Sequence, residues 1–283
     1  MTDSRHEIPT PPELPGEAVP GAYGIRTVKG SPAEPSHGIF PIVRYDAQGK
    51  MYLLGTGFFI TTSGLFVTAR HVLMATFDSH GVERYPIGIV QFLPERIFIP
   101  RPILRCTSHR TADVAVGVAA PMTRNQDGKP LINPALTLTF VPPDLDARVV
   151  TFAYPKHANQ ILDNAQIINL IPTWYDGDVK EYYPNGRDRV LMPAPCYRTS
   201  IIIHSGASGG PVFSRSGCVF GVNSTGIDGT DISFVSRINE IFSLTIEDVS
   251  MGSEPPRSVP ISEIIRAGHI SVSPPLFGLR RST

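Results

Sequence analysis

Long apolar runs are missing from this sequence, and their absence argues against several kinds of membrane or secreted protein. No stretch reaches the roughly 18 apolar residues that a membrane-crossing helix needs. The first residues, MTDSRHEIPTPPELPGEAVPG, lack the apolar core of a secretory signal. We therefore expect no membrane partner and a cytoplasmic, reducing location.

Cysteine is scarce as well. There are three cysteines, Cys106, Cys196 and Cys218. An odd and small number does not make a disulfide framework, and their spacing matches no zinc site. Neither H-E-x-x-H nor G-x-x-x-x-G-K-[ST] occurs, which argues against a zincin or a P-loop enzyme. We expect Cys196 and Cys218 to be buried thiols, and we expect no metal and no cofactor.

Neither sign of charge is in excess. Lys and Arg together number 25, as do Asp and Glu, so the formal net charge is zero. Nucleic-acid-binding proteins usually carry a basic excess or stripe, so no nucleic-acid partner is expected.

Proline is concentrated near the start of the chain. Residues 1–36 hold seven prolines and little apolar periodicity, which predicts a disordered arm that is either a tail or a docking arm for a regulatory partner. We expect one folded domain over 37–270, divided near 121–147, and a loose tail over 271–283.

The folded part is predicted to be all-β. Short β-prone runs follow one another from Gly38 without amphipathic helices between them, which favours a barrel or a sandwich. Helical patterns are few. They are ARHVLMA (69–75), RINEIFSL capped by Ser236, and ISEIIRA (261–267). The β-prone runs are IFPIVRY, MYLLGTGFFI, LFVT, PIGIVQFL, RIFIPRPIL, DVAVGVA, RVVTFAY, AQIINLI, YRTSIII, CVFGVNS and DISFV.

The segment HSGASGGPVFS (204–214) has the pattern of a nucleophile turn. It places Ser208 in a glycine-rich bend between two apolar runs. A serine nucleophile has to project from a tight turn so that main-chain N–H groups can face the developing oxyanion. The other interpretation of this segment alone is an ordinary Gly/Ser turn.

Two further segments supply residues that could activate a serine. In GTGFFITTSGLFVTARHVL (55–73), His71 comes directly after a predicted strand. In RTADVAVGV (110–118), Asp113 precedes an alternating apolar strand, where its carboxylate could be half-buried and directed at an imidazole. Each residue alone would be read as structural.

Together, in the order His, Asp, Ser, the three segments resemble the motifs of the trypsin-like (chymotrypsin-fold) serine peptidases over roughly 38–246. The resemblance implies two six-stranded antiparallel β-barrels with the active site between them and short C-terminal helices. It also implies that His71 is the general base, that Asp113 orients it, and that the N–H groups of Gly206 and Ser208 form the oxyanion hole. The substrate would be a protein or peptide.

The resemblance extends to substrate binding. GVNSTG (221–226) matches the edge that pairs with substrate, so Ser224, Thr225 and Gly226 would bind peptide backbone, and Ser224 would also support the aspartate. The primary pocket would lie between Ile202, Ile203, His204 and Ser205 on one side and Asn223 to Gly226 on the other. Because Ile202 stands where trypsin has an acidic residue, Arg/Lys selectivity is not expected.

One family feature is absent. Ala207 precedes the nucleophile where digestive enzymes have an aspartate, and no IVGG-like segment occurs inside the chain. The ion pair that switches on trypsin zymogens is therefore not available, as in bacterial and organellar members of the family.

The polar stretch from Pro172 to Pro195 is long for a connection. Its aromatic residues, Trp174, Tyr175, Tyr182 and Tyr183, are interpreted either as walls of the cleft or as part of a surface hairpin.

Two other functions remain as alternatives. Gly206–Gly210 fits the G-x-S-x-G pattern of α/β-hydrolase esterases, with Asp231 or Asp248 and His269 as partners, but Pro211 argues against the required helix. A catalytically silent protease-fold binding module is the other alternative, because a fold does not guarantee activity.

Overall fold

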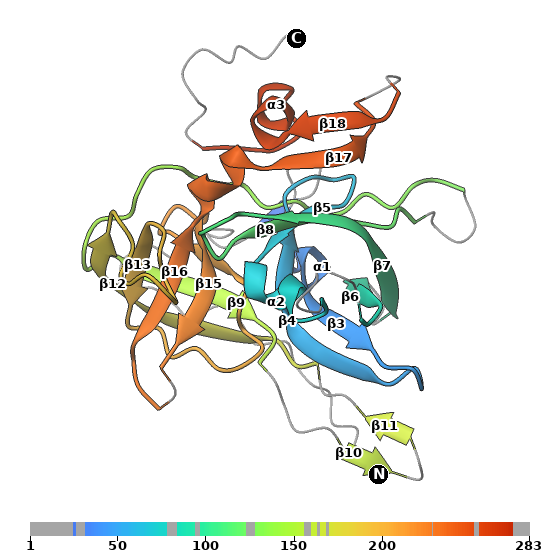
Figure 1. The fold of residues 1–283 in the computed structure, drawn as a ribbon, viewed down its shortest axis with the longest axis horizontal. Helices are drawn as coiled ribbons and strands as arrows, with labels where there is room; N and C mark the ends of the chain where they lie inside the picture. The colour runs from blue at the N-terminus through green and yellow to red at the C-terminus, as the bar shows by residue number, and fades with distance from the viewer. Residues whose placement is uncertain are drawn as a thin grey trace.

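The chain forms two closed barrels of six antiparallel strands, which lie side by side in this computed structural model (Figure 1). This confirms the predicted all-β architecture. The structure describes residues 25–26, 32–77, 84–93, 97–122, 128–155, 160–162, 165–167, 170–227, 229–251 and 255–273.

The first barrel closes in the order β3-β4-β5-β8-β7-β6. Its aromatic residues pack inside, where the ring centroids of Phe40 lie 4.5 Å from Phe59 and 5.6 Å from Phe66. Its strands are β3 (Ile39–Tyr45), β4 (Met51–Phe59), β5 (Leu65–Thr68), β6 (Ile87–Leu93), β7 (Ile97–Ser108) and β8 (Ala115–Ala119).

The second barrel closes in the order β12-β13-β16-β15-β14-β9. Val149, Val212 and Val235 are among the buried residues that fill it. Its strands are β9 (Arg148–Ala153), β12 (Thr173–Tyr183), β13 (Cys196–Thr199), β14 (Pro211–Phe213), β15 (Val219–Gly226) and β16 (Ser233–Arg237).

Strand β12 corrects the interpretation of 172–195 as a connection, because only 184–195 joins two strands. Trp174 does not line a cleft: its ring packs 5.0 Å from Phe152 and 6.3 Å from Phe213. The run AQIINLI is also not a barrel strand. Its first residues form β11 (Ala165–Ile167), which pairs only with β10 (Gln160–Leu162).

The helices are short. The predicted turns at 69–75 and 261–267 are α2 (Arg70–Met74) and α3 (Ile261–Arg266). The predicted helix after Ser236 is instead the 3-10 helix η2 (Ile238–Ser243). Ser236 does not cap it, because Ser236 lies in β16. Among the described residues, no helix is both long and apolar enough to cross a membrane.

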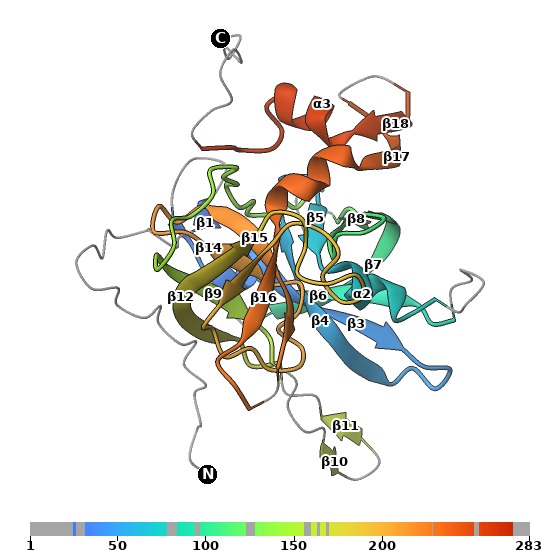
Figure 2. The same cartoon turned by 60° about the vertical axis from the view of Figure 1, so that its left-hand side comes forward.

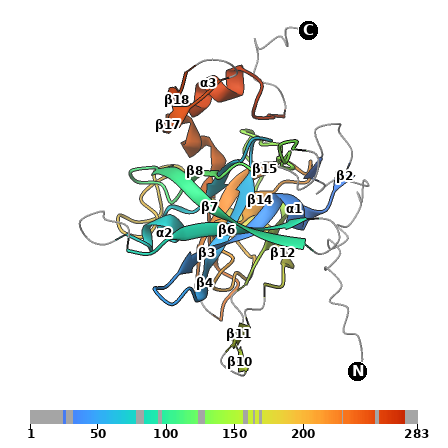
Figure 3. The same cartoon turned by 90° about the vertical axis from the view of Figure 1, so that its right-hand side faces the viewer.

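Segments outside the barrels lie at both ends of the chain. Parts of the predicted N-terminal arm form β1 (Ile25–Arg26), β2 (Pro32–Ala33) and the start of α1 (Pro35–Gly38), while 1–24 and 27–31 lie outside the described residues. After η2 the chain forms the hairpin of β17 (Thr245–Val249) and β18 (Arg257–Pro260), which lies with α3 beyond the barrels (Figures 2 and 3).

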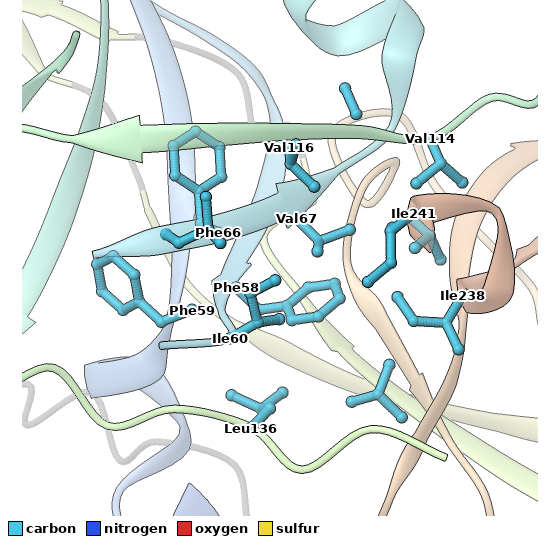
Figure 4. Packing of buried hydrophobic residues seen from close by; sticks show 14 of the residues in the cluster. Phe58, Phe59, Ile60, Phe66, Val67, Val114, Val116, Leu136, Ile238 and Ile241 are labelled. Atoms are coloured by element: carbon cyan, nitrogen blue, oxygen red, sulfur yellow. The ribbon is translucent and has the colours of Figure 1, made fainter. Parts of the chain in front are cut away.

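A continuous core joins η2 to the first barrel. Ile238 and Ile241 belong to the same buried cluster as Phe58, Val67 and Val114. Figure 4 shows the two isoleucines facing the strands of that barrel, with Ile241 directed toward Val114. This packing fixes η2 beside the segment that carries Asp113.

Candidate active site

The pairing of β5 with β8 brings His71 and Asp113 together. Thr68 and Ala115 are cross-strand partners. His71 follows Thr68 by three residues and Asp113 precedes Ala115 by two, so both lie at the same end of this strand pair. His71 Nδ1 lies 2.8 Å from Asp113 Oδ2, and the His71 main-chain N–H donates to Asp113 Oδ1 at 2.9 Å. Both carboxylate oxygens of Asp113 therefore hold His71.

Asp113 is suited to remain ionised in this position. Its side chain is 15% exposed, whereas that of His71 is 51% exposed. Burial raises the pKa of Asp113, but hydrogen bonds from His71 and the Ser224 hydroxyl, with the charge of His71, outweigh burial and hold that pKa below its usual value. An ionised Asp113 fixes the proton of His71 on Nδ1 and leaves Nε2 as a base.

Ser208 lies in a bend whose glycines are required by the backbone. Gly206 and Gly209 have φ of 94° and 88°, which L side chains rarely adopt. A Cβ on Gly209 would also lie 2.1 Å from the carbonyl oxygen of Thr56 and 2.2 Å from Thr68 Oγ1. Gly209 therefore lets the bend at Ser208 press against the strands that lead to His71.

Ser224 connects Ser208 to Asp113 through hydrogen bonds. Its hydroxyl donates to Asp113 Oδ2, and its carbonyl oxygen accepts the Ser208 hydroxyl at 3.0 Å. Within the described residues, this is the hydrogen bond that the Ser208 hydroxyl makes, and none joins it to His71. In this rotamer the Ser208 hydroxyl faces Ser224, and it would have to rotate before a proton could pass to the His71 imidazole.

Thr56, which the sequence did not single out, holds the bend at Ser208 from the other barrel. Its hydroxyl donates to the carbonyl oxygen of Gly206 at 2.9 Å, and its N–H donates to that of Ser208 at 2.8 Å. Across the described part of the chain, neither the Gly206 nor the Ser208 N–H has a hydrogen-bond acceptor. Two unused donors of this kind are what an oxyanion hole requires.

The predicted wall at 202–205 is mostly at the surface. Ile202 is 51% exposed, His204 and Ser205 are also exposed, and Ile203 packs against the interior of the second barrel. A Cβ on Gly226 would lie 3.5 Å from the Ile203 carbonyl oxygen, so the two predicted walls meet there.

The opposite wall is more buried than expected. Asn223 does not lie at a pocket edge, because it is fully buried and its amide donates to Thr151 Oγ1 at 2.7 Å. Thr225 and Gly226 pair with β16, whereas the register with β14 ends at Val222. No described strand covers the other edge of Thr225 and Gly226, as binding by strand addition requires.

The cysteines are not part of this site. Cys196 and Cys218 are buried and without disulfides, and burial raises the pKa of Cys196 to about 11. In the part of the chain that the structure describes, no group of three or more His, Cys, Asp or Glu side chains could hold a metal ion.

Comparisons with known proteins agree with the fold. Residues 55–222, more than half of the chain, match the model of the trypsin-like peptidase domain. The fold is similar to that of the Rv3671c protease from M. tuberculosis in its active form, with 20% identity, 73% of this chain and 78% of that chain covered, and a TM-score of 0.50. It is also similar to Deg5, with 18% identity, coverage of 73% and 86%, and a TM-score of 0.52. A comparison with curated proteins gives no match.

Proposed function

Because the chain belongs to the family of trypsin-like peptidase domains, we propose that it is a serine endopeptidase in which Ser208, His71 and Asp113 act as a catalytic triad. The observation that carries this proposal is the hydrogen-bonded series from His71 through Asp113 and Ser224 to Ser208. It supports the proposal because it brings a base, the group that orients it and a nucleophile from two barrels to one place.

The proposed reaction begins with a rotation of the Ser208 hydroxyl from Ser224 to His71. His71 Nε2 accepts the proton as the serine oxygen attacks the peptide carbonyl, and Asp113 stabilises the resulting imidazolium. The N–H groups of Gly206 and Ser208 bind the oxyanion. His71 then protonates the leaving amine, which gives an acyl-enzyme that water hydrolyses with the same groups.

Substrate backbone is proposed to add to β15. The uncovered edge at Thr225 and Gly226 supports this, because an extended peptide can make main-chain hydrogen bonds there. The primary pocket is proposed to take small side chains, because Ile202 and Ile203 give it a mostly apolar wall. A cleavage profile dominated by Arg or Lys would contradict that preference.

The experiment compares wild type with Ser208→Ala and His71→Ala, using a fluorophosphonate label and a peptide library. We expect label on Ser208 and peptide cleavage in wild type, and neither in Ser208→Ala or His71→Ala. Ser216→Ala is the matched control, since Ser216 is an exposed serine on a turn beyond β14 and should keep full activity.

The second candidate is a catalytically silent binding module, and the Ser208–Ser224 hydrogen bond is the observation that favours it. A folded wild-type protein that neither reacts at Ser208 nor cleaves any library peptide would support this candidate. The α/β-hydrolase alternative is excluded by the fold, because β14 and not a helix follows Ser208.

A further inference from the structure

His109, which directly follows β7, organises the bend that carries Asp113. Its main-chain N–H donates to the Val114 carbonyl oxygen at 2.9 Å and closes the bend. Its ring Nδ1 accepts the N–H of Ala112 at 2.8 Å and that of Thr111 at 3.2 Å. The residue immediately before Asp113 is therefore fixed by an imidazole rather than by a strand.

These contacts determine the tautomer of His109. Because Nδ1 accepts main-chain N–H groups, the ring proton resides on Nε2. Nε2 lies 3.8 Å from Glu240 Oε2, and the His109 and Glu240 side chains are both largely buried. Glu240 belongs to η2, which follows the last strand of the second barrel.

Few other contacts hold this bend. Arg70 Nη1 donates to the Arg110 carbonyl oxygen at 2.6 Å, and the remaining hydrogen bonds of Asp113 are those with His71 and Ser224. Ala112 and Val114, on either side of Asp113, are buried in the core, and His109 adds the hydrogen bonds that orient the main chain between them.

We propose that His109 is a positioning residue for the triad: through Nδ1 it sets the main chain before Asp113, while its Nε2 faces Glu240 of η2 at 3.8 Å. The inference rests on the proposed peptidase function. It adds a residue outside the three motifs to those that set the aspartate.

The test uses two substitutions at His109 and one control histidine. His109→Asn places an amide oxygen near the position of Nδ1 and keeps an acceptor for Ala112, whereas His109→Leu keeps the bulk and removes the acceptor. His269→Leu is the control, because His269 is an exposed histidine after α3. The readouts are kcat, KM, urea unfolding and the low-field proton NMR signal of the bond between His71 and Asp113.

We expect His109→Leu to lower kcat on the order of 10- to 100-fold with little change in KM, as misplacement of a catalytic group does. The low-field signal should shift or vanish, and His109→Asn should restore most of kcat. If His109→Leu does not fold, His109→Gln replaces it, since its amide reaches past the Nδ1 position, and the same loss of kcat is expected.

The outcomes separate this inference from the proposed function. Unchanged kcat and an unchanged low-field signal in the folded His109→Leu or His109→Gln variant would overturn the positioning role, and so would equal loss in His109→Asn. Asp113→Asn serves as the reference and should lower kcat on the order of 10⁴-fold. If Asp113→Asn keeps full activity, the proposed triad itself is wrong.

Discussion

Ala207 is the position at which an added charge would test the missing zymogen switch. It is fully buried, and its N–H and carbonyl oxygen are already bonded to His204 and Gly210. Ala207→Asp and Ala207→Asn add side chains of nearly the same size, so the cost of overpacking, about 1–3 kcal/mol, should be similar in both. The difference between the two variants isolates the charge, and desolvation of an unpaired carboxylate is expected to cost several kcal/mol more.

The pH dependence gives the sign of this effect. Burial raises the pKa of the introduced carboxyl in the folded state, so the folded protein binds the proton more tightly than the unfolded chain. The free energy of unfolding of Ala207→Asp should therefore fall as pH rises above about 4, by at most about 1.4 kcal/mol per pH unit, and level off above the raised pKa. Below about pH 4 the aspartate and asparagine variants should have equal stability.

The assay is urea unfolding between pH 4 and 8 in a Ser208→Ala background, which prevents self-cleavage. Fluorescence of the single tryptophan, Trp174, reports the second barrel because its ring packs on Phe152 and Phe213. Equal stability of Ala207→Asp and Ala207→Asn at pH 8, with no pH-dependent difference, would show that a cation meets this position and would refute the reasoning.

Three further predictions concern other buried groups. Thr56→Val should lower kcat about 10-fold or more, because valine leaves the Gly206 carbonyl oxygen without its donor, whereas Thr56→Ser keeps that donor and should not. Equal kcat values for the two variants in steady-state kinetics on one peptide would contradict this. Arg101→Met should lower the free energy of unfolding by about 3 kcal/mol. The buried guanidinium donates hydrogen bonds to several oxygens, including those from Nε and Nη2 to the Ala120 carbonyl oxygen at 2.9 and 2.7 Å. An unchanged midpoint in a urea titration would contradict this. Iodoacetamide at pH 8 should modify the exposed Cys106 before Cys196, whose pKa of about 11 leaves almost no thiolate; peptide mass spectrometry would show the order.

The three motif segments could be singled out because they occur together and in the order His, Asp, Ser, although His71 and Asp113 alone carry no distinctive pattern. A glycine-rich bend with Ser208 has few structural solutions, and a histidine directly after one strand can meet an aspartate directly before its neighbour. The structure confirms the barrels and brings His71 and Asp113 into contact. The pairing of β5 with β8 that brings them together was not predicted, since no spacing in the sequence states it.

Strand β12 could not be predicted, because its outward residues carry ion pairs. Asp176 and Asp178 bind Arg148, and Asp178 also binds Lys180, while Val179 is buried. These charges made 172–195 resemble a polar connection, whereas the structure pairs them with one another on the outside of the barrel.

Thr56 and His109 escaped sequence analysis for a different reason, which is that their partners are set by tertiary structure. Thr56 bonds to Gly206 across 150 residues, and the Glu240 that faces His109 belongs to a 3-10 helix where a capped α-helix was expected. Single polar residues of this kind belong to no sequence motif. Their roles can be identified only from the hydrogen bonds that they make in the folded structure.

Ser224 unites the parts of the site in a way that its sequence context hides. It lies at an irregularity of β15, where the register with β16 shifts between Asn223 and Thr225, and such bulges redirect side chains. Its hydroxyl thus reaches Asp113 while its carbonyl oxygen holds Ser208. If substrate backbone adds at this edge, a peptide N–H that binds the Ser224 carbonyl oxygen competes with the Ser208 hydroxyl for that acceptor. Such competition would weaken the hold on the hydroxyl as substrate binds, so the resting hydrogen bond is compatible with an active peptidase.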